Sequence, residues 1–95
     1  MYSNFLPVRG SLIPDPNFER ILIQRGYDSG EIDGKVLTSN IQYVTSLSAN
    51  DLTNKVTDLT GIEDFKSLEY LYAYHGAITK IDVSKNLKLK HLEID

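Results

Sequence analysis

The segment "HLEID" at residues 91–95 is the part of this sequence from which metal chemistry could be built. His91, Glu93 and Asp95 alternate, and alternate residues of an extended strand project from the same face. Imidazole and carboxylate groups are the ligands that a catalytic zinc ion accepts. Three ligands on one exposed strand nevertheless lack the supporting hydrogen bonds that orient a metal site. The favoured interpretation is therefore a row of solvated strand residues.

A second group of acidic residues lies in "DSGEIDGKV" at 28–36, where the acids stand at positions 28, 31 and 33. Ile32 occupies a position where an EF-hand calcium loop needs an oxygen ligand, so the EF-hand spacing is missed. The segment is interpreted as a solvated loop. No cysteine and no G-x-S-x-G motif is present, and we predict no catalytic residue, no metal site and no cofactor.

Tyrosines alternate with small or apolar residues in "YLYAY" at 70–74. If Leu71 and Ala73 point into a core, the tyrosines point outward beside polar residues of the neighbouring strand. Tyrosine offers a large contact area with a polar tip, which suits stacking on a sugar or anchoring a peptide. Tyrosine is also simply favoured in strands, and both interpretations stay open. The candidate ligand-binding residues are Tyr70, Tyr72, Tyr74, His91 and Glu93.

The segment "IPDPNFERILIQRGY" has the clearest helical pattern and would lie upstream of these strands. Asp15 suits the N-cap and Pro16 the first helical position. Gly26 suits the left-handed residue that ends a helix. A short helical turn, capped by Thr38 or Ser39, is expected further along. The residues expected on one stripe of the first helix are Phe18, Ile21, Leu22 and Arg25.

From Val44 onward, apolar residues recur mainly in steps of three, which fits neither a long helix nor a simple alternating strand. Leu68 and Leu89 stand 21 residues apart, and so do Leu71 and Leu92. A period in the twenties with L-x-x-L is typical of leucine-rich repeats, which bury their apolar side by stacking on neighbouring repeats. The predicted fold class is α/β, a leucine-rich repeat solenoid with a short parallel sheet and an N-terminal helical cap.

Two sets of motifs carry a family resemblance over about residues 12–95. "IPDPNFERILIQRGYDSGEIDGKVLTSNI" resembles the N-terminal cap of secreted leucine-rich repeat proteins of the Bacteroidetes. "VTDLTGIEDFKSLEYL" and "ITKIDVSKNLKLKHL" resemble their repeats and the 21-residue repeats of the internalins. The resemblance implies a non-enzymatic module that binds a protein or a glycan on its concave face, in an exported or cell-surface bacterial protein. A structural spacer without a ligand is the alternative, and a metal-dependent site at His91 is the more remote one.

The domain boundaries expected from these patterns are an extended arm or vector remnant at 1–13, the cap at 14–43, and about two and a half truncated repeats at 44–95. The net charge of −3 with interspersed signs argues against a nucleic-acid partner. No apolar stretch is long enough for membrane insertion, and the N-terminus is not an intact signal peptide. The uncapped C-terminal edge predicts either a longer protein or self-association through that edge.

Overall fold

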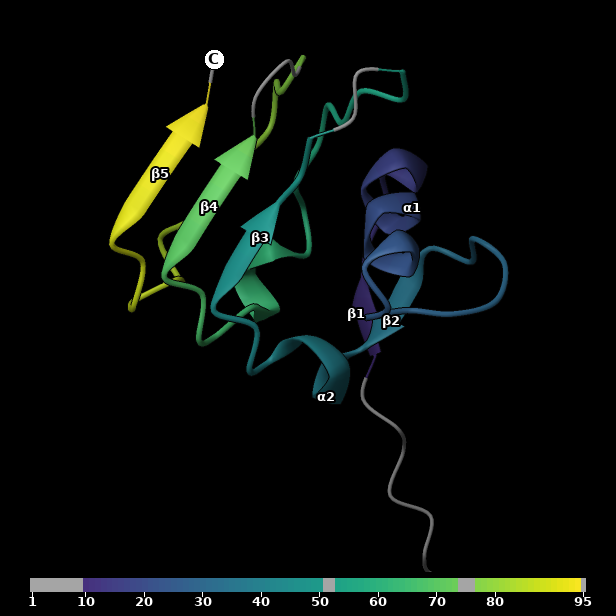
Figure 1. Cartoon of the computed structure of the whole chain (residues 1–95), viewed down its shortest axis with the longest axis horizontal. Helices are drawn as coiled ribbons and strands as arrows, with labels where there is room; N and C mark the ends of the chain where they lie inside the picture. Colours follow the sequence, from purple (N-terminus) through teal and green to yellow (C-terminus); the bar gives the residue numbers. More distant parts are fainter. Residues whose placement is uncertain (1–9, 51–52, 74–76, 95) are drawn as a thin grey trace, which may run out of the picture.

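The computed structural model describes residues 10–50, 53–73 and 77–94. Figure 1 shows the two parts of this structure, an N-terminal cap on one side and a parallel sheet on the other. The cap contains the helix α1, and the sheet contains the strands β3, β4 and β5 lying side by side. A short helix, α2, follows β2 and precedes β3 in the chain.

The cap begins with a pair of antiparallel strands, β1 (Gly10–Leu12) and β2 (Lys35–Leu37). Only an extended segment was expected at residues 10–12, and the acidic loop was expected to run on to residue 36. Ser11 pairs opposite Val36, and both are buried while the residues on either side of them are exposed. The two strands therefore present one side to the core.

The predicted helix is confirmed as α1 (Pro16–Gln24). Asp15 is its N-cap, and Oδ1 of Asp15 accepts a hydrogen bond of 2.8 Å from the backbone N–H of Asn17. Gly26 has the positive φ of 85° expected of a residue that ends a helix. The buried side of the helix faces the core through Phe18, Ile21 and Leu22.

The expected helical turn is present as α2 (Thr38–Ile41), and Ile41 is fully buried. The capping prediction is wrong, because the N-cap is Leu37 and no side chain caps the helix. The Thr38 hydroxyl is instead within 2.8 Å of Ser11 Oγ, which in turn donates a hydrogen bond of 2.6 Å to Oδ2 of Asp64. These two hydroxyls and the Asp64 carboxylate join β1, α2 and the first repeat.

The leucine-rich pattern forms a three-stranded parallel sheet of β3 (Ser46–Ser48), β4 (Tyr70–Ala73) and β5 (His91–Ile94). Leu47 pairs with Leu71, and Leu71 pairs with Leu92. The 21-residue period therefore places Leu92 beside Leu71 on adjoining parallel strands, as predicted.

The other side of the repeats consists of turns and a 3₁₀-helix, η1 (Ile62–Asp64). A parallel bridge joins Asp58 to Lys80, so the two repeats are in register on this side as well. The ring of Phe18 in α1 stacks on the ring of Phe65 with centroids 6.2 Å apart. Helix α1 thus packs over the open end of the first repeat and caps it.

Asn86 makes a buried side-chain contact that joins one repeat to the next. Its side-chain amide donates hydrogen bonds of 2.8 Å to the carbonyl of Ile62 and 3.1 Å to the carbonyl of Phe65, both in the preceding repeat. Asparagine in such a turn commonly bonds the neighbouring backbone, but this amide reaches back 24 and 21 residues along the chain. The local pattern does hold for Asp82, whose Oδ1 accepts from the backbone N–H of Ser84 at 2.8 Å.

Burial falls from the first repeat to the last. Leu47 and Leu71 are almost completely buried, whereas Leu92 and Ile94 keep 41% and 38% of their surface exposed. Within the part of the chain that the structure describes, β5 pairs with β4 on one side only. The last strand therefore has a free edge.

Candidate functional site

The outward side of the parallel sheet gathers four of the predicted binding residues, Tyr70 and Tyr72 from β4 and His91 and Glu93 from β5. We call these four residues the tyrosine face. The sheet register places Tyr70 beside His91 and Tyr72 beside Glu93. Leu71 and Ala73, between and after the tyrosines, are buried. The alternation of the strand thus separates the core from the tyrosine face, as the sequence predicted.

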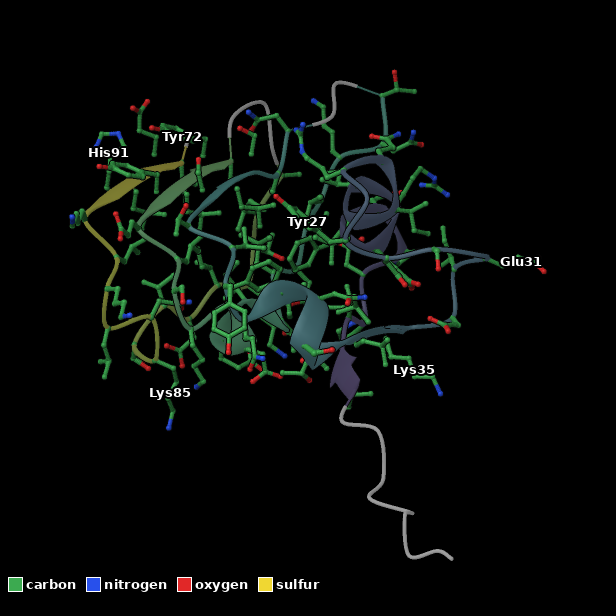
Figure 2. The ribbon with its side chains drawn as sticks, turned by 60° about the horizontal axis from the view of Figure 1, so that its bottom comes forward. Tyr27, Glu31, Lys35, Tyr72, Lys85 and His91 are labelled. Carbon is green, nitrogen blue, oxygen red and sulfur yellow. The ribbon has the colours of Figure 1, made fainter. Side chains whose placement is uncertain are left out.

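The aromatic and ionisable groups of the tyrosine face contact one another. The rings of Tyr72 and His91 lie with centroids 5.6 Å apart at a tilt of 46°. Nε2 of His91 lies 2.5 Å from Oε1 of Glu93. Figure 2 shows Tyr72 and His91 next to each other at the end of the molecule opposite to Glu31. The face therefore combines a half-buried aromatic ring with a hydrogen-bonded histidine–carboxylate pair.

The other side of Tyr70 and Tyr72 is flanked by small hydroxyl residues of β3. Ser46 pairs with Tyr70, and Ser48 pairs with Tyr72. Two members of the predicted sets, Tyr74 and Asp95, lie outside the described residues. Of the remote alternative, a metal site formed by His91, Glu93 and Asp95, only His91 and Glu93 are therefore among the described residues.

A second cluster was not foreseen from the sequence and lies in the cap. Glu19 of α1 and Asp28 and Asp33 of the following loop each place a carboxylate oxygen within 4.8 Å of the others. We call these three residues the acidic cluster. Glu31, the remaining acid of the loop, is exposed at its tip (Figure 2). The loop expected to be solvated thus brings two of its three acids back onto the helix.

Glu19 is the centre of the acidic cluster and has no exposed surface. Its Oε1 accepts backbone hydrogen bonds of 3.1 Å from Asp33 and 2.7 Å from Gly34. Burial raises the pKa of Glu19, and the neighbouring carboxyl groups of Asp28 and Asp33 raise it further, against the effect of these backbone donors. Glu19 stands three residues before Leu22, so helical spacing alone places it beside the buried stripe. That spacing was the available signal.

Asp28 carries a buried acceptor without a donor. Its Oδ1 accepts from the backbone N–H of Ser29 at 2.8 Å. Its Oδ2 has less than 1 Å² of accessible surface and accepts no hydrogen bond. The Glu19 carboxyl lies within hydrogen-bond reach of the Asp28 side chain, so a proton on Glu19 would satisfy an Asp28 oxygen. A pocket of about 290 Å³, lined by Asp28, Asp33 and Lys35 among others, opens beside the cluster.

The parallel sheet has one strand per repeat, with paired leucines 24 residues apart between β3 and β4 and 21 residues apart between β4 and β5, and this is a fold of the leucine-rich repeat type. Among solved structures, the chain is similar to an internalin, inlF, from Listeria monocytogenes strain 4b F2365, with a TM-score of 0.63 and 24% sequence identity. The similarity covers 87% of this chain and 24% of that one, so this chain spans about a quarter of the length of the internalin chain. No protein-family profile and no curated protein matches the sequence.

Among the described residues, no helix has the length and apolar character needed to cross a bilayer.

Proposed function

We propose that this chain is a non-enzymatic, protein-binding leucine-rich repeat module whose ligand binds the tyrosine face. The observation that supports the proposal most is the exposure of aromatic and ionisable groups side by side on the outward side of the sheet. Tyr70 keeps 38% of its surface exposed, and Tyr72 packs against His91 instead of entering the core. Tyrosine and histidine beside a carboxylate give contact area and directional hydrogen bonds at one place.

The internalin-like fold supports the same proposal, because a short parallel sheet exposes one side of every repeat to a partner. In the solenoid that we propose, this outward side of the sheet is the concave side. Tyr74 belongs to the proposed surface by the alternation of the sequence. A glycan ligand is the alternative, since tyrosine rings also stack on sugars, and a spacer without a ligand is the remaining one.

A screen of the chain on protein and glycan arrays, followed by affinity measurements on variants, tests the proposal. Tyr72→Ala should weaken partner binding by more than about 1 kcal/mol, roughly fivefold in Kd, if Tyr72 lies at the centre of the contact. Tyr43→Ala is the matched control, because Tyr43 is 77% exposed and lies outside the parallel sheet. Binding that survives replacement of both Tyr70 and Tyr72 by alanine would place the ligand elsewhere. The absence of any partner on both arrays would favour the spacer.

The edge of β5 supports self-association as a further part of the proposal. Leu92 and Ile94 are partly exposed on this strand, and unpaired strand edges pair readily with other strands. Sedimentation velocity over a range of protein concentrations tests it, and sedimentation as a monomer at every concentration would contradict it.

Export to the cell surface is also a proposal, and it rests on the resemblance of the cap and the repeats. Protease treatment of intact cells that express the natural protein tests it. Protection of the protein until the cells are lysed would contradict it.

A further inference from the structure

We propose that a pocket between helix α2 and the start of β3 binds a neutral pyranose sugar. The inference concerns the junction of the cap with the first repeat and is independent of the ligand proposed for the tyrosine face. The pocket has a volume of about 510 Å³, which falls in the range of about 300–1,000 Å³ that small-molecule sites occupy. We call it the junction pocket. Six of its lining residues carry a phenol, hydroxyl or amide group, namely Tyr27, Ser39, Asn40, Tyr43, Thr45 and Ser46.

Two tyrosines from different segments give the junction pocket its aromatic character. Tyr43 follows α2 and keeps 77% of its surface exposed. Tyr27 follows α1, is half-buried and packs against the hydrophobic core, and Figure 2 shows it near the middle of the molecule. An exposed tyrosine ring is a large apolar surface with a polar tip, so a ligand that covers the ring face and leaves the hydroxyl bonded is favoured.

The polar groups around these rings can both donate and accept hydrogen bonds. The side chain of Asn40 offers two N–H donors and an acceptor oxygen, and the hydroxyls of Ser39 and Ser46 each offer a donor and acceptors. All three residues are exposed, so a ligand can reach them. A pyranose has CH groups on the faces of its ring and hydroxyls around its edge. Aromatic surface beside amide and hydroxyl groups therefore matches a sugar better than it matches an apolar peptide side chain.

The charge of the junction pocket favours an uncharged ligand. Among the described residues that line it, none is acidic, basic or histidine. A phosphorylated or acidic ligand would need arginine or lysine beside it, and a cationic ligand would need a carboxylate. A charged ligand would lose hydration here without gaining a partner. The tyrosine face differs in this respect, because it carries His91 and Glu93.

Backbone hydrogen bonds hold the walls of the junction pocket in place. The N–H of Tyr27 donates to the carbonyl of Leu22 at 2.9 Å, which fixes the chain after α1. The carbonyl of Thr45 accepts from the N–H groups of Glu69 at 2.7 Å and Tyr70 at 3.0 Å, which fixes the opposite wall against the next repeat. A pocket whose walls are already ordered loses less conformational entropy when a ligand binds.

The proposal is tested by titrating the whole ¹⁵N-labelled chain with the methyl glycosides of glucose, galactose, mannose and N-acetylglucosamine in NMR experiments. We expect at least one of them to shift the amide signals of Tyr27 and of residues 39–46. The expected Kd is on the order of 1 mM, the level that a ligand of roughly 13–16 non-hydrogen atoms reaches. No shift with any of the four up to about 20 mM, a roughly twentyfold excess over that Kd, would overturn the proposal. An equal response to N-acetyl-leucine amide would overturn the assignment to a sugar, and a stronger response to glucuronate than to glucose would overturn the assignment to a neutral ligand.

Variants of the exposed lining residues make the test specific, and their exposure means that the fold should tolerate them. Tyr43→Ala should weaken sugar binding at least about fivefold, whereas Tyr43→Phe should stay within about twofold because it keeps the ring. Asn40→Ala should weaken binding at least about threefold through its lost hydrogen bonds. The matched controls are Leu87→Ala, which removes an 89% exposed apolar side chain, and Gln24→Ala, which removes an exposed amide. Equal losses in the controls, or a loss in Tyr43→Phe as large as in Tyr43→Ala, would overturn the site.

The same variants separate the junction pocket from the tyrosine face. A protein partner of the tyrosine face should bind Tyr43→Ala as tightly as the wild type, whereas the sugar should not. Replacement of both Tyr70 and Tyr72 by alanine should leave the sugar shifts in residues 39–46 in place. Sugar binding that is lost in this double variant and kept in Tyr43→Ala would overturn the junction pocket, and it would leave the protein-binding proposal to its own test.

Discussion

The two ends of the parallel sheet differ in what covers them. At β3 and the first repeat, the cap supplies the stacked ring of Phe18, the Asp15 carboxylate and the Ser11 hydroxyl. At β5, the structure described here supplies no comparable layer, and the leucine of the same repeat position is partly exposed. Burial of a leucine in this fold is therefore set by its neighbouring layer and not by the repeat motif alone.

The largest effect expected from this difference concerns the register partners Leu71 and Leu92. Leu71→Ala should lower the free energy of unfolding by about 2–5 kcal/mol, because it empties a fully enclosed position. Leu92→Ala should cost about 1 kcal/mol or less, because much of that side chain already contacts solvent. Urea unfolding followed by circular dichroism measures both.

Protein concentration sharpens this pair of measurements. Equal costs for the two leucines at high concentration, and unequal costs at low concentration, would show that a second copy covers β5. Equal costs at every concentration would break the comparison, because the edge would then be covered within the single chain.

The second prediction probes the close approach between the cap and the first repeat at Gly61. This glycine has φ of +109°, and a Cβ built there would lie 2.4 Å from Ile13 Cδ1 and 2.7 Å from the carbonyl oxygen of Leu12. Gly61→Ala should therefore cost about 2–4 kcal/mol, because backbone strain and overpacking add together.

Gly34 provides the matched control for Gly61. Its φ is +83°, but a Cβ there would meet no atom within 4 Å. Gly34→Ala should cost only the strain of the left-handed backbone, about 1–2 kcal/mol. Equal costs for the two alanine variants in urea unfolding would show that the cap does not press on Gly61 as tightly as the structure indicates.

The third and smallest effect concerns Asp15, which joins the cap to the first repeat. Its Oδ2 accepts backbone hydrogen bonds of 2.8 Å from Thr57 and 3.0 Å from Asp58. Burial alone would raise the pKa of Asp15, but these backbone donors and that of Asn17 hold the pKa below its ordinary value of 3.8. Asp15→Asn should lower the free energy of unfolding by about 1–2 kcal/mol at pH 7.

The pH dependence of this difference follows from the lowered pKa. The stabilisation by the Asp15 carboxylate is fully present above the pKa of the unfolded chain and is lost as the pH falls through the lower pKa of the folded chain. The difference between wild type and Asp15→Asn should therefore be constant at neutral pH and should shrink below about pH 4. Glu19, whose pKa shift has the opposite sign, contributes equally to both proteins. A difference that grows on acidification would contradict the assigned role.

Local features of the sequence predicted much of the framework of this fold. Asp15, Pro16 and Gly26 act within a few residues of themselves, so they indicated the ends of α1 correctly. The spacing of Leu71 and Leu92 predicted the register of β4 and β5, because equivalent positions of neighbouring repeats stack on one another. The alternation around Tyr72 predicted the tyrosine face for the same local reason.

Contacts between distant segments could not be predicted in this way. Oδ2 of Asp15 accepts a hydrogen bond from the backbone N–H of Thr57, which lies 42 residues further along the chain. Glu19 lies close to Asp28 and Asp33 in a loop whose sequence spacing did not indicate this cluster. The pairing of β1 with β2 depends on a short strand on each side of a helix. Single polar residues carry no periodicity, so only the folded arrangement reveals their partners.

The contact of Asn86 has a consequence for anyone who would cut or lengthen this protein. The carbonyls of Ile62 and Phe65 each accept a second hydrogen bond from Asn86, which belongs to the repeat that follows them. A module boundary drawn at the end of the leucine pattern of one repeat would thus remove the second donor of both carbonyls and leave only the backbone N–H groups of Phe65 and Leu68 bonded to them. The natural building block is offset from the sequence repeat, and grafts or deletions should be joined after the asparagine of the next turn.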